Sequence, residues 1–370
     1  MVLYPKSGYV CTKNEREIQM KKIPYNKESL MKLVKELYAG DDFIVAQQMS
    51  ETYSDGGHKV TTELGWFDNV GAKHPAMLGF DIAHAVNEYG EEDLDVLAGE
   101  FIDYASEGGI VTLCGHFRNP HLPNPDDKTY YRGHLGMEDE WEAVMNPETP
   151  TGKVFKDDLD KVCRFLKKLD DAGVPVLWRP LHEMNGNWFW FCVGQYDWGQ
   201  DPLYIPKEYA ERMWRYIYKV CTEEFGLKHL IWVFSPNVGC KEGMYCYPGD
   251  DVVDIVAFDW YPGSIEIPDS VKNDYKNLCE TGKPFAIGEF GPGNNRTDYA
   301  VSPEDKFNNL DALRMFRDMN SQNVRFAWVM FWSSWAQVKI SVHNMKYADK
   351  LMNAPEVYNL DRVKDYFDKH

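Results

Sequence analysis

Short apolar runs recur along the chain, and polar or amphipathic stretches separate them. Each run is five to seven residues long, nearly continuous, and rich in β-branched and aromatic side chains. That pattern is typical of parallel strands that are buried on both faces. We therefore predict eight strands: Phe43–Gln48, Ala76–Phe80, Ile110–Cys114, Val174–Trp178, His229–Phe234, Val252–Phe258, Pro284–Gly288 and Arg325–Phe331.

The stretches between these runs have the periodicity of amphipathic helices. In the segment 206–225, Tyr209, Met213, Tyr216 and Val220 recur at helical spacing. The same pattern predicts helices over about 28–39, 91–107, 159–172, 206–225, 270–280 and 304–322.

Eight strands that alternate with helices, with no GxGxxG fingerprint, favour a (β/α)8 barrel (a TIM barrel) over a doubly wound sheet. A length of 370 residues allows two or three domains, but one barrel with loop insertions fills the same length. We predict a single domain, with a barrel over 41–370 and an N-terminal cap segment over 1–40 that covers the barrel bottom. The segment 115–158 is rich in Pro, Asn, Asp and Gly and is expected to decorate the catalytic face.

The charge of the chain narrows the range of partners. Lys and Arg number 40 and Asp and Glu number 58, which gives a formal net charge of −18. Such a chain repels nucleic acid and anionic membrane surfaces, so we expect neither as a partner. A neutral polysaccharide is compatible with this charge, and the 12 Trp and 22 Tyr offer flat faces for sugar rings. No obligate protein partner is evident.

Other features bear on metal binding and location. None of the eight cysteines forms a CxxC pair, which argues against zinc ribbons and thioredoxin-like chemistry. No run of 18 apolar residues predicts a transmembrane helix, and residues 1–15 lack the apolar core of a signal peptide. The sequence leaves open whether the protein is intracellular or a mature form whose signal has been removed.

Polar and aromatic residues stand at the carboxyl ends of five predicted strands. In a barrel these ends surround one mouth, where barrel enzymes carry their active sites. The residues concerned are His116, His182, Glu183, Asp259, Tyr261, Glu289 and Trp332.

Two glutamates at such strand ends suggest cleavage of a glycosidic bond. That reaction needs one carboxyl group to protonate the leaving oxygen and a second to act at the anomeric carbon. An acid requires a raised pKa, which we expect for Glu183 from an apolar setting and from the neighbouring carboxylate. Trp188 and Trp190 are candidates for the apolar part. Tyr261 is a candidate donor that keeps the second carboxylate ionised. The two histidines are expected either to bind sugar hydroxyls or to hold the carboxylates.

Three other motifs favour plainer interpretations. His116 and His121 lack a third ligand at a recognisable spacing, which argues against a zinc site. GEFGPGN at 288–294 lacks the Lys-Ser/Thr of a phosphate loop, and YPGDD at 247–251 is expected to be a turn rather than a calcium loop.

The motif RPLHEMNGNWFWF at 179–191, followed by IGEFG at 287–291, resembles glycoside hydrolase family 26. This is a family of retaining (β/α)8 enzymes, most of them β-1,4-mannanases. The resemblance covers roughly residues 40–335, and further motifs support it: GH-x-x-NP at 115–120, SPN at 235–237, YPGDDVVD at 247–254 and D-x-Y at 259–261.

The resemblance implies a role for each candidate residue. Glu183 would be the acid/base, Glu289 the nucleophile, and Tyr261 would orient the nucleophile. His116, His182 and Trp332 would line the subsite of the distorted sugar. Trp188 and Asp259 would support substrate binding. The resemblance further implies a mannan, galactomannan or glucomannan substrate, secretion, and neither a metal nor an organic cofactor.

The chain departs from the family pattern at two places. WFWF is followed by Cys-Val-Gly rather than directly by glycine, so we expect a different loop after Phe191. The end of the second strand reads GFDIAHAVNEYG, for which we expect a remodelled glycone side that can favour release of short products.

Alternative functions remain open at this point. Mixed-linkage β-1,3-1,4-glucan and β-1,3-xylan are substrates within the same family. A noncatalytic sugar-binding barrel would be expected to lack one of the two glutamates. A metal-dependent barrel hydrolase would need His or Asp ligands at several strand ends.

Overall fold

The computed structural model describes residues 21–50, 59–121, 138–195, 203–263, 266–292, 310–334 and 338–370. Eight parallel strands close into a barrel in the order β1-β10-β9-β8-β7-β4-β3-β2. The predicted (β/α)8 fold is confirmed. The strands are β1 (Ile44–Gln48), β2 (Met77–Asp81), β3 (Ile110–Gly115), β4 (Val176–Pro180), β7 (Leu230–Phe234), β8 (Ile255–Trp260), β9 (Phe285–Phe290) and β10 (Trp328–Phe331).

All eight predicted strands are present, with shifted ends. β4 continues to Pro180, which brings Arg179 into the barrel wall. β8 begins at Ile255 because a 3-10 turn, η3 (Asp250–Val252), precedes it. This turn forms the end of the YPGDD motif.

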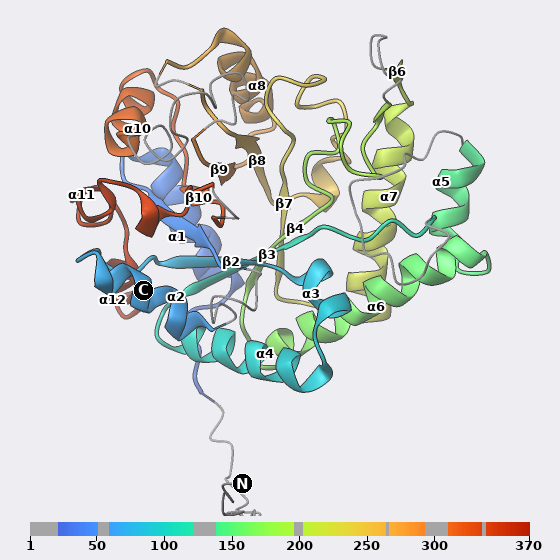
Figure 1. Ribbon diagram of the computed structural model, residues 1–370, viewed down its shortest axis with the longest axis horizontal. Helices are drawn as coiled ribbons and strands as arrows, with labels where there is room; N and C mark the ends of the chain where they lie inside the picture. Colours follow the sequence, from blue (N-terminus) through green and yellow to red (C-terminus); the bar gives the residue numbers. More distant parts are fainter. Residues whose placement is uncertain are drawn as a thin grey trace, which may run out of the picture.

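The helices lie around the strands, as Figure 1 shows. Those that the periodicity predicts are α1 (Lys27–Ala39), α4 (Glu91–Ser106), α6 (Pro150–Asp171), α7 (Lys207–Lys219), α8 (Asp269–Cys279) and α10 (Ala312–Ser321). α6 begins at Pro150 rather than near 159, because the Thr149 side chain caps its first turn and proline suits the first helical position. α7 continues into a π turn, η2 (Val220–Glu224). The expected start of α10, residues 304–309, lies outside the described residues.

The hydrophobic periodicity does not give the bounds of several further elements. They are the helices α2 (Val60–Asn69), α3 (Ile82–Glu88), α5 (Glu138–Met145), α11 (Ala348–Met352) and α12 (Leu360–Phe367), the 3-10 turn η5 (Val342–Asn344), and the antiparallel pair β5 (Gly194–Gln195) and β6 (Leu203–Tyr204). α3 follows β2 without a loop, because Asp81 ends the strand and its side chain accepts from the backbone N–H of His84.

The barrel interior is packed rather than open. Every residue of β1, β2, β4, β7, β8, β9 and β10 is buried. Beneath the mouth, a cavity of about 10 Å³ is lined partly by Gln48, Cys114, Arg179 and Gly288. That volume holds roughly one water molecule.

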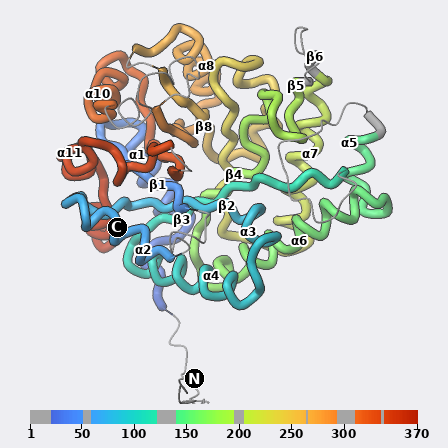
Figure 2. Tube along the Cα trace, in the orientation of Figure 1, coloured from blue at the N-terminus to red at the C-terminus, as the bar shows by residue number. Residues whose placement is uncertain are grey.

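Both ends of the described chain contact the bottom of the barrel. Tyr25, ahead of α1, stacks on Phe367 of α12 with ring centroids 4.4 Å apart. Its hydroxyl donates to the Gly109 carbonyl, just before β3. In the view of Figure 2 the C-terminus lies near α2, and the backbone N–H of Leu360, at the start of α12, donates to the His74 carbonyl just after α2. The division into a cap segment (1–40) and a barrel (41–370) stays a prediction, because residues 1–20 lie outside the described part.

None of the described helices combines the length and the apolar character that a membrane crossing requires.

Candidate active site

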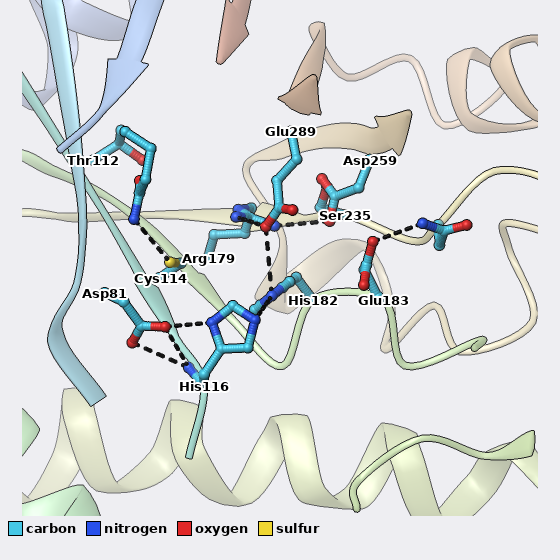
Figure 3. Close-up of polar contacts among 12 residues, drawn as sticks. Asp81, Thr112, Cys114, His116, Arg179, His182, Glu183, Ser235, Asp259 and Glu289 are labelled. Carbon is cyan, nitrogen blue, oxygen red and sulfur yellow. Dashed lines mark hydrogen bonds and ion pairs between the residues drawn. The ribbon is translucent and has the colours of Figure 1, made fainter. Parts of the chain in front are cut away.

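The two candidate glutamates face one another at the carboxyl ends of the strands (Figure 3). Glu183 follows β4 and Glu289 lies on β9, and the two residues are only 6% and 4% exposed. One carboxylate oxygen of each, together with one of Asp259, lies within 4.8 Å of the others. Carboxyl groups this close suit a retaining glycosidase, since inverting enzymes separate theirs by about 6.5–9.5 Å.

The backbone around Glu183 is held in an unusual conformation. Leu181 has φ +49° and Glu183 has φ +56°, in the left-handed region that side chains other than glycine rarely adopt. The backbone N–H of Glu183 donates to the Ser235 carbonyl at 2.8 Å. Contact with β7 thus helps to fix a turn that aims the side chain into the mouth.

Two donors hold the Glu183 carboxylate. Trp188 Nε1 donates to Oε2 and Asn237 Nδ2 donates to Oε1, each at 2.6 Å. Burial and the nearby charge of Glu289 nevertheless raise the pKa of Glu183 to about 7, although these two hydrogen bonds lower it in part. A carboxyl group with this pKa is partly protonated near neutral pH and can act as an acid.

Burial and a neighbouring carboxylate are the expected causes of that pKa shift, but the hydrogen bond from Trp188 acts in the opposite direction. Trp188 acts on Glu183 as a hydrogen-bond donor, which favours the charged form. Trp190 is fully buried, and its Nε1 donates to the Phe117 carbonyl at 2.7 Å. Burial and Glu289 raise the pKa of Glu183.

Glu289 is positioned by a bulge in β9. The register to both neighbouring strands slips by one residue between Ile287 and the end of β9. A side chain on Gly288 would have its Cβ 2.4 Å from Ser235 Oγ and 2.6 Å from Asp259 Oδ1. Only glycine permits this approach. Tyr261 Oη donates to Glu289 Oε2 at 2.7 Å.

Arg179 is a site residue that the sequence reasoning missed. Its side chain is buried and donates to Asp259 Oδ2 at 2.8 Å and to Glu289 Oε1 at 2.5 Å. Its sequence signal is a charged residue in the apolar strand VLWRP. Asn237, inside the SPN motif, was missed as the donor to Glu183.

Asp259 is buried within this network. It is 0% exposed, and its oxygens accept from Arg179 and from Ser235 Oγ, the latter at 2.5 Å. With no exposed surface, this carboxylate can support substrate binding only through partners such as Arg179 and Ser235, and that expected role stays a prediction.

The two histidines form a chain toward Glu289 (Figure 3). His116 Nδ1 is hydrogen bonded to Asp81, and the Nε2 atoms of His116 and His182 are 2.9 Å apart. His182 Nε2 is also 3.5 Å from Glu289 Oε1. His182 is 0% exposed, so it does not line the subsite as the resemblance implies. It fits the other expectation, that a histidine holds a carboxylate.

Partly exposed aromatic side chains surround this buried network. Trp188, Tyr261 and Trp332 are half-buried, and the ring centroid of Trp332 is 5.8 Å from that of His116. The expectation that these rings contact a sugar in the mouth stays a prediction.

The profile of glycosyl hydrolase family 26 matches residues 23–362. The chain belongs to this family.

Two curated proteins that are similar to this chain are both named mannan endo-1,4-beta-mannosidases. A "Mannan endo-1,4-beta-mannosidase A and B" of Caldalkalibacillus mannanilyticus is 33% identical over 270 residues, which cover 72% of this chain and 47% of that protein. A mannan endo-1,4-beta-mannosidase of Bacillus subtilis is 35% identical over 233 residues, 61% of each chain. The chain thus spans about half to three fifths of the length of these two curated relatives.

The fold of family 26 is also found in a solved structure of Bacillus subtilis mannanase man26. It superposes with a TM-score of 0.69 at 24% identity, over 90% of this chain and 92% of that one. At this identity the likeness concerns the fold.

The departure from the family 26 pattern after WFWF is buried next to the backbone of Glu183 rather than exposed in the mouth. Phe191 and Cys192 are fully buried, and Cys192 Sγ is 3.3 Å from the Glu183 carbonyl oxygen. The second departure, GFDIAHAVNEYG at 79–90, contains Asp81, whose carboxylate is hydrogen bonded to His116 Nδ1.

Within the described part of this family 26 chain, two clusters each bring three possible metal ligands within 4.8 Å of one another. They are Asp81–Cys114–His116 and Glu183–Asp259–Glu289. In the first, Asp81 and His116 are hydrogen bonded, and in the second, the guanidinium of Arg179 supplies positive charge. His121 belongs to neither. The absence of a metal or organic cofactor stays a prediction, which a chelator without effect on turnover would support.

Proposed function

We propose that this chain is a retaining glycoside hydrolase that cleaves β-1,4-mannosidic bonds in mannan, galactomannan or glucomannan. The observation that carries the proposal is the close approach of Glu183 and Glu289, within 4.8 Å, at the mouth of a family 26 barrel. The names of the curated relatives support mannan as the substrate.

In the first step Glu183 protonates the leaving glycosidic oxygen while Glu289 attacks the anomeric carbon. The bond to the leaving sugar breaks, and a covalent glycosyl–enzyme ester forms on Glu289. Tyr261 and Arg179 donate to Glu289 and hold its carboxylate in place for the attack.

In the second step Glu183 acts as a base. It takes a proton from water, the water oxygen attacks the anomeric carbon, and the Glu289 carboxylate leaves. Esterified Glu289 carries no charge, so one cause of the raised pKa of Glu183 is removed. The loss of that charge lowers the pKa of Glu183 after it has given up its proton, so Glu183 stays ionised and can act as the base of the second step.

Substrate binding falls to the half-buried rings and to His116. Trp188 and Trp332 are placed to stack on neighbouring sugars, and the net charge of −18 is compatible with a neutral polymer. Because a polysaccharide of this kind lies outside cells, we also propose that the protein is secreted.

Product analysis on soluble mannan, mixed-linkage glucan and β-1,3-xylan tests the substrate. We expect oligosaccharides from mannan, and their length distribution separates endo from exo cleavage. Hydrolysis of glucan or xylan alone would overturn mannan as the substrate. No hydrolysis of any of the three would favour a noncatalytic sugar-binding barrel.

Proton NMR of the first products tests the mechanism. We expect the newly formed reducing end to be β before it mutarotates, and an initial α product would exclude retention. Glu289→Ala should abolish turnover without unfolding the protein. Glu183→Ala should slow mannan hydrolysis far more than hydrolysis of an aryl mannoside with an activated leaving group, which needs little protonation. Equal losses on both substrates would argue against Glu183 as the acid.

A further inference from the structure

Asp81 stands at the start of a chain of contacts that ends at Glu289 (Figure 3). Asp81 is 1% exposed, and each of its oxygens lies 3.2 Å from the backbone N of His116. Oδ2 is also bonded to His116 Nδ1, and Oδ1 accepts from the backbone N–H of His84 at 3.0 Å. Every described contact of this carboxylate is therefore with a donor.

The contact between His182 and Glu289 indicates which ring nitrogen of each histidine carries the proton. His182 Nε2 lies 3.5 Å from the Glu289 carboxylate, which favours a proton on that nitrogen. The pKa of His182 is well below its usual range, because of burial and the neighbouring His116 and Arg179, so the ring is neutral and carries one proton. Its Nδ1 is buried without a hydrogen-bond partner among the described residues, and a proton there would be an unpaired buried donor.

A proton on His182 Nε2 requires an acceptor on His116. The two Nε2 atoms are 2.9 Å apart, so one nitrogen must present its lone pair to the other. His116 meets this requirement when its own proton is on Nδ1. Asp81 stabilises that arrangement by accepting from Nδ1.

We propose that Asp81 is a positioning residue for Glu289, acting through the two histidines between them. Its carboxylate holds the proton of His116 on Nδ1. His116 Nε2 then presents its lone pair to His182, so that the proton of His182 stays on Nε2, the ring nitrogen that lies 3.5 Å from Glu289 Oε1. The proposal rests on Glu289 being the nucleophile of the proposed reaction.

Asp81→Asn should reverse the tautomers of His116 and His182 with little change in the shape of the side chain at position 81. If the amide oxygen of Asn takes the backbone N–H groups of His84 and His116, its NH2 group faces His116 Nδ1. The opposite orientation would place NH2 against those backbone donors. The variant therefore moves the proton of His116 to Nε2, and the His182 lone pair then faces the Glu289 carboxylate.

The first experiment is long-range ¹H–¹⁵N correlation NMR on protein labelled with ¹⁵N-histidine, with His116→Gln for assignment. We expect His116 as the Nδ1–H tautomer and His182 as the Nε2–H tautomer, and both reversed in Asp81→Asn. A doubly protonated His116 in the unmodified protein, or unchanged tautomers in the variant, would overturn the proposal. This measurement needs no substrate, so it is independent of the mannanase proposal.

Turnover is the second readout. In Asp81→Asn we expect kcat to fall about 10–100-fold with little change in KM, as for other residues that orient a functional group.

Two controls separate positioning from a structural role. Asp311→Asn makes the same change at an exposed helix cap, where Oδ1 accepts from the Arg314 N–H, and should leave kcat unchanged. In a His116→Gln background, Asp81→Asn should cost no further kcat if it acts through the imidazole. Additive losses in that double variant, or a lower melting temperature with normal kcat, would overturn the proposal.

Discussion

The charge state of Glu183 depends on opposing influences from single neighbours. Burial and the Glu289 carboxylate favour the protonated acid, whereas the donors Asn237 and Trp188 favour the carboxylate. The balance lies near neutral pH, where Glu183 can give a proton in one step and take one in the next. Changing one neighbour should therefore shift the pH range of activity before it changes the fold.

Asn237→Ala removes one of these donors. The pKa of Glu183 should rise, because the hydrogen bond from Asn237 favours the charged form. Activity that needs the protonated acid is full below this pKa and is lost as pH rises through it. The alkaline limb of kcat/KM should thus move from near 7 to higher pH by about one unit, which corresponds to ~1.4 kcal/mol.

Asn353→Ala is the matched control for this change. Its side-chain amide donates to the Gly71 carbonyl, away from the mouth, so the limb should stay in place. An Asn237→Ala limb that stays in place or moves to lower pH would contradict the role of Asn237.

At the scale of elements, the bulge in β9 aligns the site. A regular strand would alternate its side chains strictly between interior and exterior. The extra residue at Gly288 lets Ile287 keep its place in the barrel wall while Glu289 reaches Arg179 and Tyr261. Alignment of the nucleophile therefore depends on the missing side chain at one position.

Gly288→Ala should be both less stable and less active. Its Cβ would lie within 2.6 Å of Ser235 Oγ and Asp259 Oδ1, and overpacking of this kind costs about 1–3 kcal/mol. Denaturant unfolding and kcat measure the two effects. Gly99→Ala on α4 meets no atom within 4 Å and should instead stabilise by roughly 0.5–1 kcal/mol. Equal behaviour of the two variants would contradict the crowding at Gly288.

Helix α2 carries a second buried carboxyl group, away from the catalytic pair. Burial raises the pKa of Glu63 to about 8, although the backbone N–H of Ser50 lowers it in part. The folded state then binds a proton that the unfolded state releases above its ordinary pKa of 4.5. The stability due to this proton is full below about 4.5 and is lost as pH rises toward 8.

Glu63→Gln should remove that loss. Between pH 5 and 8 the free energy of unfolding of the unmodified protein should fall relative to the variant by about 1.4 kcal/mol per pH unit. His343, 3.6 Å away, has a pKa lowered to about 4 by burial and by Lys339, and its opposite effect is present in both proteins. Unfolding at several pH values provides the measurement, with exposed Glu92→Gln as control. A difference that does not depend on pH would contradict the prediction.

At the scale of the whole molecule, the net charge of −18 predicts how activity responds to salt. A neutral polymer is not steered by this charge, and the Debye length is only about 10 Å at 0.1 M salt. We expect kcat/KM on unsubstituted mannan to change less than about twofold between 0.05 and 0.5 M NaCl. A steep dependence would indicate a charged substrate.

The barrel could be predicted from the sequence because strands that are buried on both faces have nearly continuous apolar sequences. The proximity of Glu183 and Glu289 could then be predicted too, since the carboxyl ends of the strands surround one mouth. The network between them could not be predicted, because Arg179 contacts residues 80 and 110 positions away. The role of Asp81 could not be predicted for a similar reason, since its partner His116 follows the next strand. Buried Asp259 and His182 show that a residue at a strand end can support the site without facing the mouth.

The contact between Tyr25 and Phe367 has a practical consequence for immobilisation. It ties the last helix to the bottom of the barrel, opposite the mouth. An anchor attached at His370 would therefore fix the molecule to a bead or fibre with its opening turned toward the liquid. Long, insoluble chains could then reach the carboxylates without passing the support.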